Sequence, residues 1–108
     1  MRIAFKMKVN NGNENEYERR HNPIWQELEK ILLDYGVKTY SIFLDRETRD
    51  LFAYAEIDSL EKWNEIACTD ICQKWWNYMS PLMLCNEDNS PVSKELREVF
   101  HLEKIMNK

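Results

Sequence analysis

Residues 51–57 read Leu-Phe-Ala-Tyr-Ala-Glu-Ile and predict the strand around which the fold is organised. Alternate side chains of a strand point to opposite faces of its sheet. Phe52 and Tyr54 then share one face, and the other face carries only aliphatic residues: Leu51, Ala53, Ala55 and Ile57. Helices can cover one face of such a sheet. We therefore expect the second face to meet another subunit, a ligand or both.

This strand is expected to pair with the segment before it. Residues 37–44 are rich in β-branched and aromatic residues and predict a second strand. The polar stretch 45–50, Asp-Arg-Glu-Thr-Arg-Asp, predicts the turn of a hairpin between the two. Near the N-terminus, residues 3–9 place apolar side chains at every second position and predict a further strand.

A helix is predicted for residues 14–35. Residues 10–13, Asn-Asn-Gly-Asn, end the first strand and supply an N-cap, and Gly36 is a natural stop. Pro23 lies in the middle of this segment. Proline lacks a backbone donor and disfavours helical geometry at the preceding residue, so we expect a kink or a break at Asn22.

One face of that helix places a histidine between two aromatic residues. Tyr17, His21 and Trp25 lie four residues apart and project from nearly one side. The same face continues with residues suited to burial: Ile24, Leu28, Ile31 and Tyr35. Imidazole, with a pKa of about 6.5, exchanges protons readily near neutral pH. His21 is thus either a hydrogen-bonded core residue or the acid–base group of a pocket.

The C-terminal half adds two short helices, a connector and a strand. The helices are predicted at residues 60–67 and 71–79, with four candidate N-caps: Asp58, Ser59, Thr69 and Asp70. Residues 82–93 predict a connector, and residues 94–102 predict a last strand. The order β-α-β-β-α-β predicts an α+β, ferredoxin-like fold, with an antiparallel sheet and helices on one face.

Length and composition indicate one domain over residues 1–108, with about 103–108 as a C-terminal extension. A net charge of −4 argues against a nucleic-acid surface, and no apolar run approaches the roughly 18 residues of a membrane helix. The N-terminus lacks the features of a signal peptide. The three cysteines, Cys68, Cys72 and Cys85, are an odd count that favours a reduced cytoplasmic compartment, and Cys68 and Cys72 are expected to be buried thiols.

No residue pattern predicts a metal or a cofactor. Zinc spacings are absent, and the only glycines, Gly12 and Gly36, cannot form a phosphate-binding loop. Aromatic residues make up 12% of the chain, which favours a lined pocket or a large interface. We therefore expect any pocket to work with side chains alone.

Two tyrosines and a tryptophan pair are further candidates for such a pocket. Tyr17 and Tyr40 could donate phenolic hydrogen bonds into one space, or could simply pack. Trp75 and Trp76 point about 100° apart on a helix, so both cannot fill one core position. One of them is expected to line a cavity or interface, where an indole suits the apolar face of a sugar. The alternative is a core tryptophan beside a half-exposed one.

Three segments together resemble the L-rhamnose mutarotase family. They are the stretch from Tyr17 to Trp25, the run Thr-Asp-Ile-Cys-Gln-Lys-Trp-Trp at residues 69–76, and Asp-Asn-Ser-Pro-Val-Ser at residues 88–93. Their common order is far more specific than any one of them. The resemblance extends from the first strand through Phe100.

The resemblance implies a homodimeric ferredoxin-like α/β barrel that works without a cofactor. It implies an isomerase that interconverts the α and β anomers of L-rhamnose. His21 matches the family's proton donor, and four residues match its sugar contacts: Tyr17, Tyr40, Trp75 and Trp76. As a mechanism, we expect His21 to protonate the ring oxygen. The acceptor of the anomeric proton stays open between Tyr17, Tyr40, a carboxylate and water.

Other functions remain open alternatives. The same apparatus could serve another 6-deoxyhexose. The β-α-β-β-α-β plan is also used by dimeric α/β-barrel monooxygenases of small molecules, and a non-catalytic sugar-binding dimer would need the same contacts. Fold alone does not separate these functions.

Overall fold

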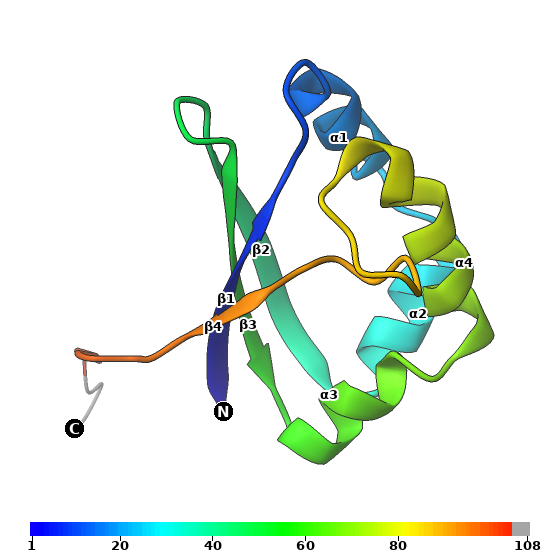
Figure 1. The fold of residues 1–108 in the computed structure, drawn as a ribbon. Coiled ribbons are helices and arrows are strands. Elements are labelled where there is room, and N and C mark those ends of the chain that lie inside the picture. Colours follow the sequence, from blue (N-terminus) through cyan, green and yellow to red (C-terminus); the bar gives the residue numbers. More distant parts are fainter. Residues whose placement is uncertain (105–108) are drawn as a thin grey trace.

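The computed structural model describes residues 1–104, which form a four-stranded antiparallel sheet with helices on one side (Figure 1). The strands are β1 (Arg2–Lys8), β2 (Val37–Asp45), β3 (Asp50–Ile57) and β4 (Lys94–Leu96), in the sheet order β2-β3-β1-β4. The helices are α1 (Glu14–Arg20), α2 (Gln26–Asp34), α3 (Leu60–Ile66), α4 (Asp70–Met79) and the 3-10 turn η1 (Ser80–Leu82). The predicted α+β, ferredoxin-like fold is confirmed.

The helix predicted for residues 14–35 is broken into α1 and α2, as Pro23 indicated. Residues 21–25 link the two helices, and the Asn22–Pro23 peptide bond is cis. Because proline cannot donate a backbone hydrogen bond, the chain leaves helical geometry here and resumes it at Gln26. The break leaves His21 at the end of α1 instead of on a continuous helical face.

The two faces of the sheet have different surroundings. Four residues of β3 are at most 1% exposed and face the helices: Leu51, Ala53, Ala55 and Ile57. On the opposite face, Phe52 of β3 lies directly across from Phe43 of β2, and these residues are 37% and 64% exposed. We call the first side the inner face and the second the outer face. The prediction that β3 would be apolar on both sides is confirmed.

The last strand is shorter than predicted. β4 ends at Leu96, and the remainder of the predicted strand, residues 97–102, has no strand pairing. Val99, Phe100 and Leu102 are 79–87% exposed there. Three apolar residues without strict alternation do not match the pleat of a sheet, so the ladder stops after Leu96.

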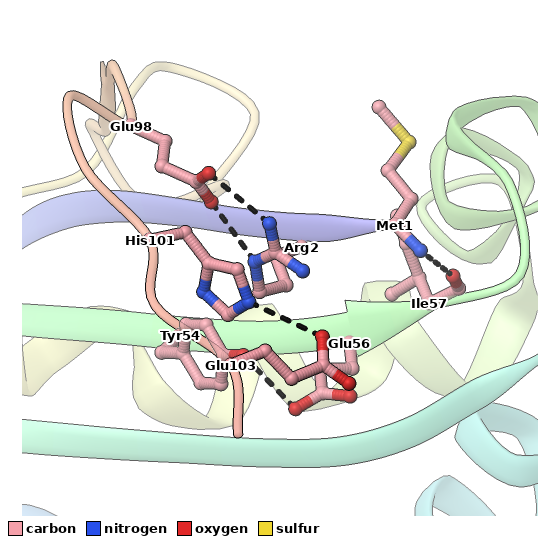
Figure 2. A network of polar contacts seen from close by, with 8 residues as sticks. All are labelled: Met1, Arg2, Tyr54, Glu56, Ile57, Glu98, His101 and Glu103. Carbon is pink, nitrogen blue, oxygen red and sulfur yellow. Dashed lines mark hydrogen bonds and ion pairs between the residues drawn. The ribbon is translucent and has the colours of Figure 1, made fainter. Parts of the chain in front are cut away.

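Polar contacts hold the start of this C-terminal tail beside the outer face (Figure 2). Arg2 donates from Nε and Nη2 to the two carboxylate oxygens of Glu98, at 2.9 and 3.1 Å. Tyr54 donates to Glu56 nearby, at 2.9 Å. Such exposed pairs are screened by solvent and add little to stability. Of the predicted extension at residues 103–108, only the first two residues lie within the described chain.

No helix in the described part of the chain is both long enough and apolar enough to cross a lipid bilayer.

Candidate active site

An open cleft lies between the inner face of the sheet and the helices and extends around the sheet to Arg2, Phe43 and Tyr54 on the outer face, with a total volume of about 1600 Å³. Its floor includes Phe5, Met7 and Leu51, and it continues past β4 to the tail. All five residues that the sequence singled out line this cleft: Tyr17, His21, Tyr40, Trp75 and Trp76. They come from α1, its C-terminal end, β2 and α4, so the fold gathers them from across the chain.

His21 is fixed in one tautomer by its own helix. Its Nδ1 lies 2.8 Å from the carbonyl oxygen of Tyr17. A carbonyl can only accept a hydrogen bond, so Nδ1 must carry the proton. Among residues 1–104, no hydrogen-bond partner faces Nε2. In the neutral ring, Nε2 therefore presents a lone pair to the cleft.

Burial also keeps the His21 ring neutral. Desolvation lowers the pKa of His21 below its usual 6.5, and the hydrogen bond to the Tyr17 carbonyl opposes this only in part. The imidazole is then uncharged at neutral pH and ready to accept a proton. Once protonated, the same nitrogen becomes a donor of low pKa, which releases its proton easily.

Aromatic rings enclose this imidazole on two sides. The Tyr17 ring lies 4.4 Å from it between centroids, and the Trp75 ring meets it edge-on at 5.2 Å. Trp25 in turn packs edge-on against Trp75 at 5.1 Å. Trp75 is buried and Trp76 is half-buried, so one indole packs inward and the other is partly open, as the sequence predicted. Trp25 serves as support behind Trp75.

The two tyrosines reach the cleft from opposite sides. Tyr17 is buried on α1, whereas Tyr40 lies half-buried on β2 and packs against Phe5 and Trp63. Burial is the main cause that raises the pKa of both phenols above the usual 10. Both therefore stay protonated near neutral pH. They can donate hydrogen bonds to a ligand but are poor proton acceptors.

Sequence reasoning gave no role to Arg20, which precedes His21 and links α1 to α4. Arg20 donates from Nη1 to the Tyr78 carbonyl at 2.6 Å, and its guanidinium stands 4.1 Å above the Tyr78 ring. Its Nε donates to Glu16 at 2.7 Å. These contacts tie the end of α1, next to His21, to α4, which also carries Trp75. The glutamate one turn earlier was the only local signal of an ordered arginine.

The cleft is also lined by connector residues to which sequence reasoning gave no role. They are Asn86 and, within the motif at residues 88–93, Asn89 and Ser90. The described chain holds no cluster of three metal-ligating carboxylates, thiols or imidazoles. Cys72 is buried as predicted, and burial raises its pKa to about 11, so this thiol is unreactive at neutral pH. Cys68 is exposed, so the prediction of a buried thiol is wrong there, because this residue follows the end of α3 and faces solvent.

Comparison with known proteins identifies the family. The family described as L-rhamnose mutarotase matches residues 2–102 of this chain. The chain belongs to the L-rhamnose mutarotase family. An L-rhamnose mutarotase of Shigella flexneri serotype 5b is 56% identical over 102 residues, which cover 94% of this chain and 98% of that protein. The match therefore spans both proteins nearly end to end.

Solved structures agree with this family. The crystal structure of L-rhamnose mutarotase FA22100 from Formosa agariphila has a TM-score of 0.88 and 46% sequence identity, covering 95% of this chain and 99% of that one. A dimeric ferredoxin-like protein from an uncultured marine organism has a TM-score of 0.63 at 14% identity, covering 97% of both chains. The second likeness shows the fold alone.

Proposed function

We propose that this chain interconverts the α and β anomers of L-rhamnose, as an isomerase of the aldose 1-epimerase type that needs no bound cofactor. The observation that carries the proposal is the His21 ring, held in one tautomer with Nε2 directed to an aromatic-lined cleft. Membership of the L-rhamnose mutarotase family supports the choice of sugar. The free thiols Cys68, Cys72 and Cys85 are compatible with a reducing cytoplasm, the location that we propose.

The chemistry requires one proton to move between two oxygens. A pyranose opens when the anomeric hydroxyl loses its proton and the ring oxygen gains one. The free aldehyde then rotates and closes on its other face. Both oxygens are bonded to the same carbon, so a single nitrogen can reach each in turn. In this mechanism His21 Nε2 accepts the anomeric proton and then donates it to the ring oxygen.

This order follows from the protonation states in the cleft. Neutral His21 has no proton on Nε2, so it must act as an acceptor before it can act as the family's donor. Tyr17 and Tyr40 keep their protons because burial raises their pKa. We assign them hydrogen bonds to sugar oxygens. Closure reverses the two transfers at His21, and the enzyme ends in its starting state.

The two indoles hold the sugar by its apolar surface. Trp75 and Trp76 offer faces to the C–H groups of the ring and to the methyl group at C6, which replaces a hydroxyl in a 6-deoxy sugar. Because mutarotation already proceeds in water, only a modest barrier reduction is needed. One oriented acid–base group supplies about 10²–10⁴-fold, which is enough for this reaction.

Saturation-transfer NMR tests the proposal directly. We expect the protein to accelerate exchange between the two anomeric signals of L-rhamnose more than those of fucose, mannose or galactose. Binding without acceleration would instead indicate a sugar-binding dimer. Oxygen consumption with an aromatic substrate would indicate a monooxygenase. Either result would contradict the proposed activity.

We also propose that the protein is a homodimer that pairs through the outer face. Phe43 on the edge strand β2 and Phe52 beside it on β3 are exposed on this face, near the turn between the two strands. Contiguous apolar rings on a sheet are expected to be covered, and a second copy offers the same self-complementary surface.

A further inference from the structure

The connector between η1 and β4 contains a motif that the proposed function leaves without a role. Figure 1 shows this segment, in yellow to orange, running from the end of α4 across to β4. Asn86, Asn89 and Ser90 of this connector line the cleft. Polar groups placed at the edge of an aromatic cleft usually set the orientation of a ligand. Their hydrogen bonds show which of them can do so.

The connector forms a tight turn that is attached to α4. The backbone N–H of Asn86 donates to the Ser90 carbonyl at 2.8 Å, and that of Asn89 donates to the Asn86 carbonyl at 3.0 Å. Asn89 has φ of 70°, which asparagine tolerates better than most residues. Its side chain contacts that of Asn77 at 3.1 Å, and Asn77 follows Trp76 on α4. The turn is therefore placed relative to the helix that carries both indoles.

Within the turn, Asp88 uses the only hydroxyl proton of Ser90. The Asp88 Oδ1 accepts from the Ser90 backbone N–H at 3.0 Å and also from the Ser90 hydroxyl. These hydrogen bonds lower the pKa of Asp88 below its usual value, so the carboxylate stays ionised and can only accept. A hydroxyl has one proton. Ser90 Oγ can then only accept from its second neighbour.

That second neighbour is the side-chain amide of Asn86. Asn86 Nδ2 lies 3.0 Å from Ser90 Oγ. The reverse orientation of the amide would place two acceptors, Oδ1 and Oγ, against each other. The NH₂ group must therefore face Ser90, and the amide oxygen must point the other way. Within residues 1–104, Oδ1 of Asn86 has no hydrogen-bond partner.

We infer that Asn86 is a specificity-determining residue, whose amide oxygen accepts a hydrogen bond from one ring hydroxyl of the bound sugar. Ser90 and Asp88 are positioning residues that orient this oxygen. The inference rests on the proposed function. The indoles favour the apolar surface of the sugar. The Asn86 amide oxygen adds an acceptor that favours a hydroxyl at one position of the ring. Asn86 is exposed, so water takes the place of a missing hydroxyl, and the expected discrimination is that of one neutral hydrogen bond.

The main experiment compares Asn86→Ala with a matched control in the same turn. Glu87 is exposed and makes no side-chain hydrogen bond within the described chain, so Glu87→Ala tests for a general disturbance of the connector. For anomer exchange of L-rhamnose, we expect Asn86→Ala to raise KM roughly three- to tenfold, the effect of one neutral hydrogen bond, with kcat within about twofold. We expect Glu87→Ala to leave both constants unchanged.

Two further variants test the positioning residues. Ser90→Ala removes the group that orients the amide, so KM should rise by less than in Asn86→Ala. Ser90→Thr keeps a hydroxyl and should restore the value of the unchanged protein. In a background that already lacks Asn86, Ser90→Ala should have no further effect on KM. A purely structural role of Ser90 would instead reduce stability equally in both backgrounds.

Sugar analogues identify the partner hydroxyl. L-rhamnose derivatives that lack one ring hydroxyl at a time are compared between the unchanged protein and Asn86→Ala. We expect one of them to bind the unchanged protein less tightly than L-rhamnose does, and Asn86→Ala to bind that derivative and L-rhamnose nearly equally. Equal losses in both proteins for every derivative would overturn the inference.

The outcomes separate this inference from the proposed function. If the protein accelerates exchange but KM is the same in Asn86→Ala, the function stands and the inference is wrong. If no exchange is accelerated, the function is wrong, and titration of tryptophan fluorescence with L-rhamnose decides the inference. In that case the inference requires that Asn86→Ala bind L-rhamnose less tightly than Glu87→Ala does. Equal binding, or no binding to the unchanged protein, overturns it.

Discussion

Both faces of the sheet carry apolar residues, but these residues are buried on one face and exposed on the other. On the inner face, β3 presents Leu51 and small aliphatic neighbours that are at most 1% exposed under the helices. On the outer face, the same strand presents Phe52 beside Phe43, and both rings remain open. The inner face completes the core of one chain and forms the floor of the cleft. The outer face has the character of an interface.

This difference shows how one strand can serve two purposes. Successive residues of β3 alternate between the faces, so the eight residues Asp50–Ile57 supply side chains both to the core and to the proposed interface. Substitutions on the inner face should therefore change folding and chemistry within one chain. Substitutions on the outer face should change association between chains. The predictions that follow test this separation, from the largest expected effect to the smallest.

The largest effect is expected at the cleft above the inner face. His21→Ala removes the proposed acid–base group and should lower kcat for L-rhamnose anomer exchange by about 10²–10⁴-fold. Saturation-transfer NMR measures this rate. The chain has one other histidine, His101, which lies exposed in the tail, so His101→Ala is the matched control and should keep full activity. Full activity in His21→Ala would refute the assigned role.

The next effect separates the two faces by stability. Leu51→Ala leaves a cavity in the core and should lower the free energy of unfolding by about 2–5 kcal/mol. Phe43→Ala should act mainly through association, so the loss of unfolding free energy that it causes should become smaller as the protein is diluted and the dimer dissociates. The loss caused by Leu51→Ala should not depend on protein concentration. Urea denaturation at several protein concentrations measures both. Matching concentration dependence in the two variants would remove the distinction between the faces.

A charge on the outer face should break the proposed dimer. In a two-fold dimer, Phe43→Asp removes two buried rings and adds two unpaired carboxylates. Each ring contributes about 1.5–3 kcal/mol, so the dissociation constant should rise at least about 100-fold. Analytical ultracentrifugation measures it. Leu33→Asp changes an equally exposed apolar residue on α2 and should leave association intact. Loss of the dimer in Leu33→Asp alone would place the interface on the helices.

The smallest effect is a change of activity with pH. Burial lowers the pKa of His21, so the neutral ring predominates above that lowered value and the imidazolium below it. The mechanism starts from the neutral ring. Activity should therefore be present at neutral pH and fall as the pH decreases through the lowered pKa, to half at the pKa itself. Exchange rates over about pH 5 to 8 measure the profile. A rise in activity on acidification would show that the imidazolium is the starting form.

The sequence predicted most of the fold because the signals were local. Alternation in residues 51–57 and the break at Pro23 depend on neighbouring residues alone, and both were confirmed. The last strand was predicted too long, at residues 94–102, because strand pairing depends on a partner. β1 pairs with β4 only from Ala4 to Lys6, so the ladder ends at Leu96.

The candidate site was predictable in composition but not in arrangement. The spacing of Tyr17 and His21 and the pair at Trp75 named residues that do line one cleft. The clamp from Arg20 to the carbonyl of Tyr78 was missed, because these residues lie 58 positions apart. The orientation of Asn86 was missed for another reason. It depends on which atom of a neighbouring side chain holds a proton.

The sequence by itself determined the order of strands and helices, the break after His21 and the apolar character of both faces of β3. Each of these follows from the backbone preferences and the periodicity of adjacent residues. Only the tertiary structure decided how deeply His21 is buried, and that the Trp75 ring packs edge-on against it. The Nδ1 hydrogen bond that sets the tautomer lies within α1 and its end, whereas the burial that lowers the pKa of His21 and the contact with Trp75 exist only once α1, α4 and the sheet have come together.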